Sequence, residues 1–193
     1  MAVVADLLLQ RTAMLLAIIV PIQPKEYPNM PSTRGEKDAC DLLDADHKAV
    51  KKMFKEYDEL TESKARSASQ RKQELAHQIC QELTVHAQVE EEIFYPALRG
   101  ALKDTDLLDE AEVEHQTAKD LIAQIQAGGE EEKIDAKVKV LGEYITHHVK
   151  EEEQPGGLFA QAKKGDEDLE AMGERMKARK EELMAEMGAK KPN

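Results

Sequence analysis

The sequence is poor in the residues that interrupt helices. It has 10 glycines and 7 prolines among 193 residues, and it has no tryptophan. Alanine, glutamate, lysine and leucine dominate instead, and all four have high helix propensity. The composition therefore predicts an all-α protein, and the length suits one domain with extensions.

Cysteine and positive charge are also scarce. The two cysteines, Cys40 and Cys80, have no zinc-site spacing and predict no disulfide framework, which fits a reducing compartment. Acidic residues outnumber lysine and arginine by 39 to 27, so the formal net charge is −12. A surface this acidic repels phosphate backbones, which argues against nucleic acid as a partner.

No apolar run is long enough to cross a bilayer. The segment MLLAIIVPI at 14–22 is too short for a spanning helix. It also makes a poor signal peptide, because Asp6 precedes it, Arg11 is the only basic residue before it, and no small-residue cleavage site follows. The sequence leaves an exported protein with a signal peptide as an alternative but favours a cytoplasmic protein that does not enter a membrane.

The beginning of the chain differs from the rest. The stretch PIQPKEYPNMPSTRG at 21–35 contains four prolines and is expected to be unstructured. We interpret residues 1–36 as an extension outside the fold that is disordered, serves targeting or precedes the true start at Met30.

Four later segments carry apolar residues with a period of 3.6, which is typical of amphipathic helices. They span about 38–62, 70–99, 105–127 and 130–153, and short polar or glycine-containing loops join them. Helices of this length with short connections pack as an antiparallel up-down-up-down four-helix bundle. We expect this bundle to occupy residues 37–162.

A fifth helical pattern at 166–187 predicts an additional C-terminal helix within a tail at 163–193. The segment has three interpretations, of which we favour the last. It docks on the bundle, it contacts a protein partner or a second copy of the chain, or it remains a frayed amphipathic tail.

Each of the four predicted helices places one histidine on the face that should be buried. Two of these histidines have a glutamate four residues later, on the same side of the helix. Because the second and fourth helices of such a bundle are diagonal neighbours, the two His–Glu pairs should face each other across the core. The six residues are His47, His86, Glu90, His115, His148 and Glu152.

Buried carboxylates and imidazoles need a compensating partner. Imidazole and carboxylate together are a ligand set for iron, manganese or zinc. Side chains from four helices reach two ions more easily than one, with the carboxylates as bridges and with open positions for a small ligand. The alternative is a set of hydrogen-bonded core histidines with no metal. A ferritin-like site fits poorly, since the two pairs here have the order His-x-x-x-Glu instead of Glu-x-x-His, and the other two helices offer histidine.

The remaining histidines lie off this pattern. His77 is on the opposite side of its helix from His86 and should be exposed. His147 is either a supporting group or the true ligand of a rotated fourth helix, and we favour His148 because it continues the apolar stripe. The neighbouring glutamates are interpreted as a solvated face: Glu91, Glu92, Glu151 and Glu153.

These segments resemble the hemerythrin-like, HHE cation-binding family. The resemblance rests on LLDADHKAV at 42–50, HAQVEEEIFYP at 86–96, EHQTAKDLI at 114–122, and HVKEEE at 148–153 followed by LF at 158–159. It implies a four-helix bundle with two non-haem iron ions (Fe²⁺/Fe³⁺), bridged by two carboxylates, that bind dioxygen or a related diatomic ligand. Carried over by position, the iron ligands would be His47, His86, Glu90, His115, His148 and Glu152.

The sequence departs from the oxygen-carrying members in two places. Lys119 stands where those members have a second histidine on the third helix, so we expect one open iron position and a lysine that reaches outward to a surface carboxylate. The residues QPGG at 154–157 interrupt the segment before LF, and we expect them to open the end of the bundle near the site.

Roles within the family vary between oxygen or nitric-oxide binding, sensing, iron handling and oxidation. We interpret this chain as a metal- and oxygen-binding protein rather than an enzyme. One alternative is a peroxide-consuming di-iron oxidoreductase with Tyr57, Tyr95 or Tyr144 near the metals. The other is a metal-stabilised interaction scaffold that uses residues 166–187.

Overall fold

The computed structural model describes residues 38–65 and 67–189. The interpretation of residues 1–36 falls outside this part of the chain. Within the described residues the protein is helical and contains no strand, which confirms the all-α prediction. None of the helices in this part is long and apolar enough to span a membrane.

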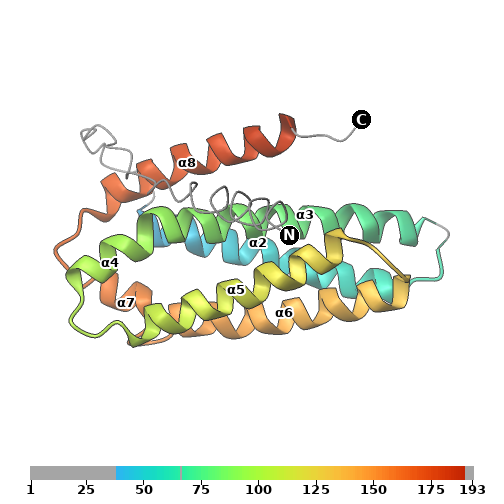
Figure 1. Ribbon diagram of the computed structural model, residues 1–193, viewed down its shortest axis with the longest axis horizontal. Helices are drawn as coiled ribbons and strands as arrows, with labels where there is room; N and C mark the ends of the chain where they lie inside the picture. The colour runs from blue at the N-terminus through green and yellow to red at the C-terminus, as the bar shows by residue number, and fades with distance from the viewer. Residues whose placement is uncertain (1–37, 66, 190–193) are drawn as a thin grey trace, which may run out of the picture.

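Four long helices lie side by side and alternate in direction (Figure 1). They are α2 (Ala39–Thr61), α3 (Ala68–Val89), α5 (Asp106–Gln126) and α6 (Glu131–Glu153). Asp38 caps α2, since its carboxylate accepts a hydrogen bond of 2.8 Å from the backbone N–H of Asp41. The up-down-up-down four-helix bundle is therefore as predicted.

The second helical run is not one regular helix, although the apolar period predicts one. After α3 it continues as a π-helical turn, η1 (Glu90–Phe94), and then as α4 (Tyr95–Ala101). Pro96 explains the irregularity, because its ring cannot donate a backbone hydrogen bond and clashes with the carbonyl one turn earlier. Single π turns often occur at functional sites, and this one begins at Glu90.

The apolar core consists of two clusters, one toward each end of the bundle. The sequence neighbours of the buried histidines belong to both. Leu43, before His47, lies in the first cluster, whereas Val50, after it, lies in the second. Along α5, Ala111 and Ala118 flank His115 in the same way. The buried polar residues therefore lie between two apolar regions.

The residues after α6 close the end of the bundle, so the predicted opening is wrong. Gly156 has φ of +92°, and Gly157 approaches α6 so closely that an added Cβ would lie 2.2 Å from the carbonyl oxygen of Glu151. This turn leads into α7 (Leu158–Ala162), whose Leu158 and Phe159 are buried.

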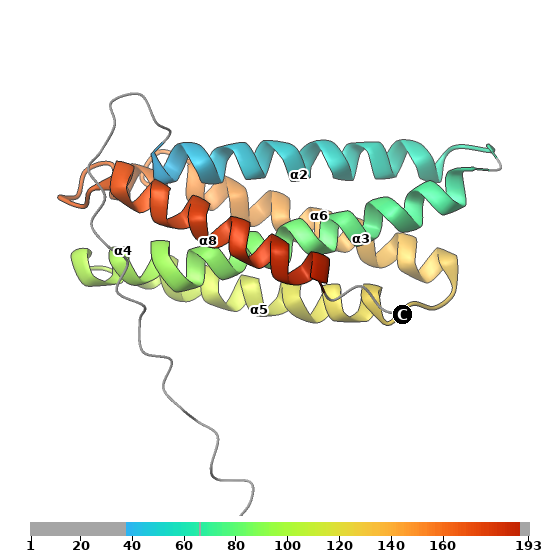
Figure 2. The same cartoon turned by 90° about the horizontal axis from the view of Figure 1, so that it is seen from above.

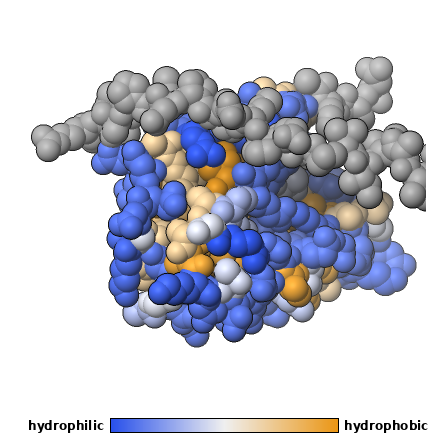
Figure 3. Space-filling view, turned by 60° about the vertical axis from the view of Figure 1, so that its left-hand side comes forward, coloured by the Kyte–Doolittle hydropathy of each residue, from blue (hydrophilic) through white to orange (hydrophobic). Residues whose placement is uncertain are grey.

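The C-terminal helix, α8 (Leu169–Ala189), docks on the bundle. It crosses α2 and α3 and also contacts η1 (Figure 2). Its apolar side is covered by the bundle, since Met172, Met176 and Leu183 are buried. Docking is therefore the correct interpretation, and the frayed tail is wrong. Much of the face shown in Figure 3 is hydrophilic, as the charged composition requires.

Candidate metal centre

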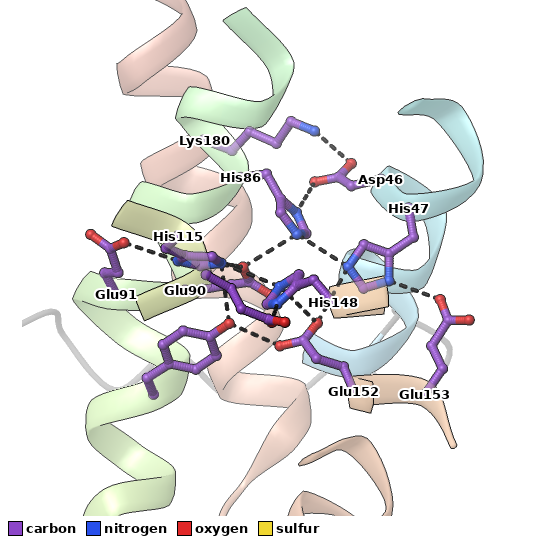
Figure 4. Close-up of polar contacts among 12 residues, drawn as sticks. Asp46, His47, His86, Glu90, Glu91, His115, His148, Glu152, Glu153 and Lys180 are labelled. Carbon is purple, nitrogen blue, oxygen red and sulfur yellow. Dashed lines mark hydrogen bonds and ion pairs between the residues drawn. The ribbon is translucent and has the colours of Figure 1, made fainter. Parts of the chain in front are cut away.

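The six side chains singled out in the sequence converge in the middle of the bundle (Figure 4). Each long helix contributes one histidine, η1 contributes Glu90, and α6 also contributes Glu152. None of the six is more than 8 % exposed. The other two histidines lie outside this group, as predicted: His77 is exposed, and the side chain of His147 is 59 % exposed.

The four imidazoles meet through the same ring nitrogen. Nε2 of His47 lies 3.1 Å from Nε2 of His86, and Nε2 of His115 lies 3.3 Å from Nε2 of His148. The histidines therefore form two pairs, one between α2 and α3 and one between α5 and α6.

The two glutamates connect these pairs. Glu90 Oε2 lies 3.2 Å from Nε2 of His86 and 3.3 Å from Nε2 of His115. Glu152 Oε2 lies 3.4 Å from Nε2 of His47 and 3.8 Å from Nε2 of His148. Each carboxylate thus reaches one histidine of each pair.

The outer nitrogen of every imidazole faces a carboxylate from a neighbouring helix. A carboxylate that accepts the Nδ1 proton leaves the Nε2 lone pair free to bind a metal. Three of the four histidines have Nδ1 at hydrogen-bond distance from an oxygen: 2.8 Å for His47 and Glu153, 2.9 Å for His115 and Glu91, and 2.8 Å for His148 and Glu114. His86 and Asp46 form a longer ion pair of 3.6 Å, and Nδ1 of His86 has no hydrogen-bond partner among the described residues.

These four carboxylates form a closed ring around the bundle. Each is the chain neighbour of one of the six inner residues: Asp46 precedes His47, Glu114 precedes His115, and Glu91 and Glu153 follow the two inner glutamates. Each one holds the histidine of another helix. Glu91 and Glu153 are therefore more than a solvated face, because each holds an inner histidine, although Glu153 itself is exposed. The only signal in the sequence was their place beside an inner residue.

Lys119 points away from the inner nitrogens, as predicted. Its Nζ donates to both carboxylate oxygens of Glu91, at 2.7 and 2.6 Å, and Glu91 in turn accepts from His115. Lys180 of α8 has the same relation to Asp46, at 2.6 Å. Two lysines therefore neutralise carboxylates that orient the imidazoles.

Burial and mutual charge set the proton affinities of the cluster. Burial, together with the nearby His86, lowers the pKa of His47 to about 3. Burial also disfavours charge on His115, but the Glu90 and Glu91 carboxylates outweigh it and raise its pKa to about 9. Burial and the charge of Glu90 raise the pKa of Glu152. Burial would also raise the pKa of Glu90, but the nearby His86 and His115 imidazoles outweigh burial and lower it, so the two inner carboxylates differ in proton affinity.

The chemistry of these atoms fits a divalent cation. Both carboxylate oxygens of Glu90, and Oε2 of Glu152, are buried without a hydrogen-bond partner among the described residues. An unsatisfied buried carboxylate costs several kcal/mol, and metal coordination removes this cost. Two groups of ligand atoms each lie within 4.8 Å of one another. The first group is His47, His86 and Glu90, and the second is Glu90, His115 and His148. Glu90 is common to both groups, which suits a bridged pair of ions.

Tyr95 borders this cluster. Its hydroxyl donates a hydrogen bond of 2.9 Å to Glu152 Oε1 and lies 3.3 Å from Nε2 of His115. Burial and the two inner glutamates raise its pKa well above the ordinary value, so the phenol stays protonated. The other two tyrosines considered lie elsewhere, since Tyr57 donates to Asp135 and Tyr144 is 43 % exposed.

A cavity of about 30 Å³ adjoins all four inner histidines. This volume holds a molecule of the size of water or dioxygen. Much of the remaining wall is apolar: Val50, Leu83, Ala118, Ile122, Ile145 and Val149. The cavity therefore suits a small uncharged molecule.

Known proteins resemble the chain over this bundle. The family described as Hemerythrin HHE cation binding domain matches residues 38–155. A protein of Nostoc sp. strain PCC 7120 named DNA nickase is 29% identical over 160 residues, which are 81% of this chain and 43% of that protein. The chain thus spans less than half the length of this relative.

A solved structure has the same fold. It is the crystal structure of a Hemerythrin HHE cation binding domain-containing protein from Mycobacterium kansasii, with a TM-score of 0.63 and 23% sequence identity. The match covers 80% of this chain and 92% of that chain.

Proposed function

Because the chain belongs to the hemerythrin HHE cation-binding domain family, we propose that its buried cluster holds two non-haem iron ions and binds dioxygen, a related diatomic molecule or peroxide. One ion would be held by His47 and His86, and the other by His115 and His148. Glu90 and Glu152 would bridge them. Iron supplies the redox chemistry and the open coordination positions at which a small ligand binds.

One observation carries this proposal. All four histidines direct Nε2 to the inside and present Nδ1 to a carboxylate, and the two inner glutamates keep oxygens without a hydrogen-bond partner. A purely structural cluster would satisfy those oxygens within the protein. Imidazoles held by outer carboxylates are the usual arrangement at metal sites.

The residues around the centre support a small ligand. The apolar cavity beside the histidines admits a small uncharged molecule and disfavours ions. Tyr95 has a protonated hydroxyl, which donates a hydrogen bond to Glu152. The residue one turn after His115 is Lys119 instead of a histidine, and its ammonium group is held by Glu91. The coordination position beside His115 would therefore be open to the small ligand.

Tyr95 also favours a second function, a peroxide-consuming oxidoreductase, because its buried, protonated phenol lies next to two of the candidate ligands, Glu152 and His115. The scaffold function loses its support, since the apolar side of α8 is covered by the bundle.

The name DNA nickase of the Nostoc relative gives no function for this chain, because the net charge of −12 opposes binding to a phosphate backbone. We propose a cytoplasmic protein, with Cys40 and Cys80 as buried free thiols.

Elemental analysis tests the proposal. Protein produced in iron-replete cells should contain two iron ions per chain, and its visible spectrum should change when the reduced protein meets air. A ratio near one, or zinc alone under these conditions, contradicts the di-iron centre. Rapid turnover of hydrogen peroxide by the iron-loaded protein would favour the oxidoreductase.

A further inference from the structure

A second group of metal-ligating side chains lies at the surface beside the buried centre. Nε2 of His147 is 3.6 Å from Glu114 Oε1 and 3.4 Å from Glu151 Oε1. Their candidate ligand atoms all lie within 4.8 Å of one another. The side chain of His147 is 59 % exposed, whereas Glu114 and Glu151 are 15 % and 25 % exposed. The group is thus open to solvent on one side.

Glu114 connects this group to the buried centre. Its Oε1 faces His147, while its Oε2 accepts a hydrogen bond of 2.8 Å from Nδ1 of His148. A cation bound by Glu114 and His147 would therefore lie one residue away from an inner histidine.

A small cavity of about 10 Å³ extends the same path inward. Glu114 and Glu151 line it from the outer group, and His148 and Glu152 line it from the inner cluster. Glu152 is 1% exposed, and its Oε2 has no hydrogen-bond partner among the described residues. A buried carboxylate with one unpartnered oxygen therefore borders the space behind the outer group, where it attracts a cation.

The other cavity at the centre is a poor route for cations. Its wall is largely apolar, and the charged residues that line it form ion pairs with residues of α8 or η1. Asp46 and Glu82 face Lys180, and Lys119 itself lies on this wall. Within the described residues, by contrast, the ion pairs of Glu114 and Glu151 are with histidines alone. We therefore expect cations to reach the centre through the cavity beside Glu114 and uncharged molecules to reach it through the apolar cavity.

We propose that Glu114, His147 and Glu151 form an outer divalent-cation site through which Fe²⁺ reaches the buried centre. One imidazole and two carboxylates are a ligand set for Fe²⁺, Mn²⁺ or Zn²⁺. Exposure to water keeps binding weak, so that the ion can leave again. The delivery role rests on the proposed inner iron centre, whereas the outer site does not.

Two variants test the delivery role in the full-length apoprotein. His147→Ala and Glu151→Gln each remove one outer ligand without touching the inner histidines. His77→Ala and Glu143→Gln are matched controls, because they change an exposed histidine and an exposed glutamate elsewhere. Fe²⁺ is added without oxygen, samples are quenched with an excess of ferrozine at increasing times, and the iron that resists chelation is counted as buried.

We expect both variants to load about tenfold more slowly than the wild type, because an acidic entry site raises the local cation concentration. The final amount of chelator-resistant iron should be unchanged, and both controls should load at the wild-type rate. Loading of the two variants at the wild-type rate overturns the delivery role. A wild type that never acquires chelator-resistant iron contradicts the inner centre instead.

The outer site has its own test, which does not depend on the inner one. Mn²⁺ is titrated into the apoprotein and free Mn²⁺ is followed by electron paramagnetic resonance. The wild type and the His77→Ala control should bind one more weak equivalent than His147→Ala does. Equal binding by the wild type and His147→Ala overturns the outer site.

Discussion

Nζ of Lys180 lies 2.6 Å from Oδ1 of Asp46, and Oδ2 of the same carboxylate lies 3.6 Å from Nδ1 of His86. Burial alone would raise the pKa of Asp46, but its contacts with His86 and Lys180 outweigh burial and lower it. A residue of the C-terminal helix thus keeps ionised the carboxylate that orients an inner imidazole. The helix α8 is in this way a part of the candidate metal centre.

Replacing Lys180 should therefore weaken metal binding. We expect Lys180→Met to lower the affinity for Zn²⁺ by about tenfold, the lower end of the effects seen when outer partners of ligating histidines are removed. Competition against a chelator of known affinity measures this change. Lys177→Met is the matched control, since Lys177 is exposed on the same helix. Equal losses in both variants would show that α8 acts through general charge and not through Asp46.

The two adjacent histidines of α6 should differ sharply. His148→Ala removes an inner imidazole together with its contacts to Glu114 and Glu152, so the loss of tightly bound metal should be large. His147→Ala should leave the final inner occupancy unchanged, because this ring lies at the surface. Metal content after dialysis against a weak chelator compares them. A larger loss in His147→Ala would mean that α6 is rotated in solution.

Removal of metal should destabilise the fold. Without a cation, Glu90 and Glu152 keep buried oxygens that no group in the described chain satisfies. A ligand present at a hundred times its dissociation constant stabilises the native state by about 2.7 kcal/mol, so the metal-free protein should melt several degrees lower. Differential scanning calorimetry before and after chelation measures the change. Equal melting temperatures would speak against a buried metal site.

Much of this arrangement follows from spacing along the chain. The apolar period locates the four long helices, and the i, i+4 relation locates the His–Glu pairs on their buried faces. The outer carboxylates do not follow from it. Whether Glu91 meets His115 depends on the axial register of two helices, which a period within one helix does not contain. The apolar period of the helix alone places Glu91 on its solvated side.

The irregular segments escaped prediction for another reason. The π turn spans five residues between two α-helical segments, and its buried residues include Ile93 and Phe94, so the run still has the apolar pattern of a continuous helix. The closing turn at Gly157 depends on a close approach to the carbonyls of α6, which is a tertiary contact. Two glycines in a row predict a break in the helix and say nothing of where the chain goes next.

Gly157 should be intolerant of a side chain. A Cβ there would lie 2.2 Å from the carbonyl oxygen of Glu151 and 2.6 Å from that of Glu152, so α7 would have to move. The ring of Phe159 in α7 is stacked on the imidazole of His47, with 5.7 Å between the ring centroids. This contact would be lost if α7 moved. We expect Gly157→Ala to lower the free energy of unfolding by roughly 2 kcal/mol and to weaken metal binding.

Chemical denaturation measures this loss, and Gly100→Ala is the control. An added Cβ at Gly100 meets nothing within 4 Å, and the residue lies in the helix α4. That variant should be neutral or slightly stabilising, because alanine is the better helix former. If Gly157→Ala is as stable as Gly100→Ala, the closing turn is not rigid.

Lys119 is the residue whose replacement best tests the open iron position. It lies one turn after His115, and its ammonium group is held by Glu91 at the rim of the centre. A protonated amine cannot bind a cation, so in the proposed centre the position beside His115 is left to water or to the small ligand. Iron with such an open position should be oxidised quickly when the reduced protein meets air.

Lys119→His would supply an additional imidazole, and we expect it to slow oxidation in air, as followed by the visible spectrum. Lys119→Gln separates the two effects, because it removes the charge near Glu91 without adding a ligand. Equal oxidation rates of Lys119→His and Lys119→Gln would show that the added imidazole does not reach the metal and that the rate depends on the charge at the rim alone.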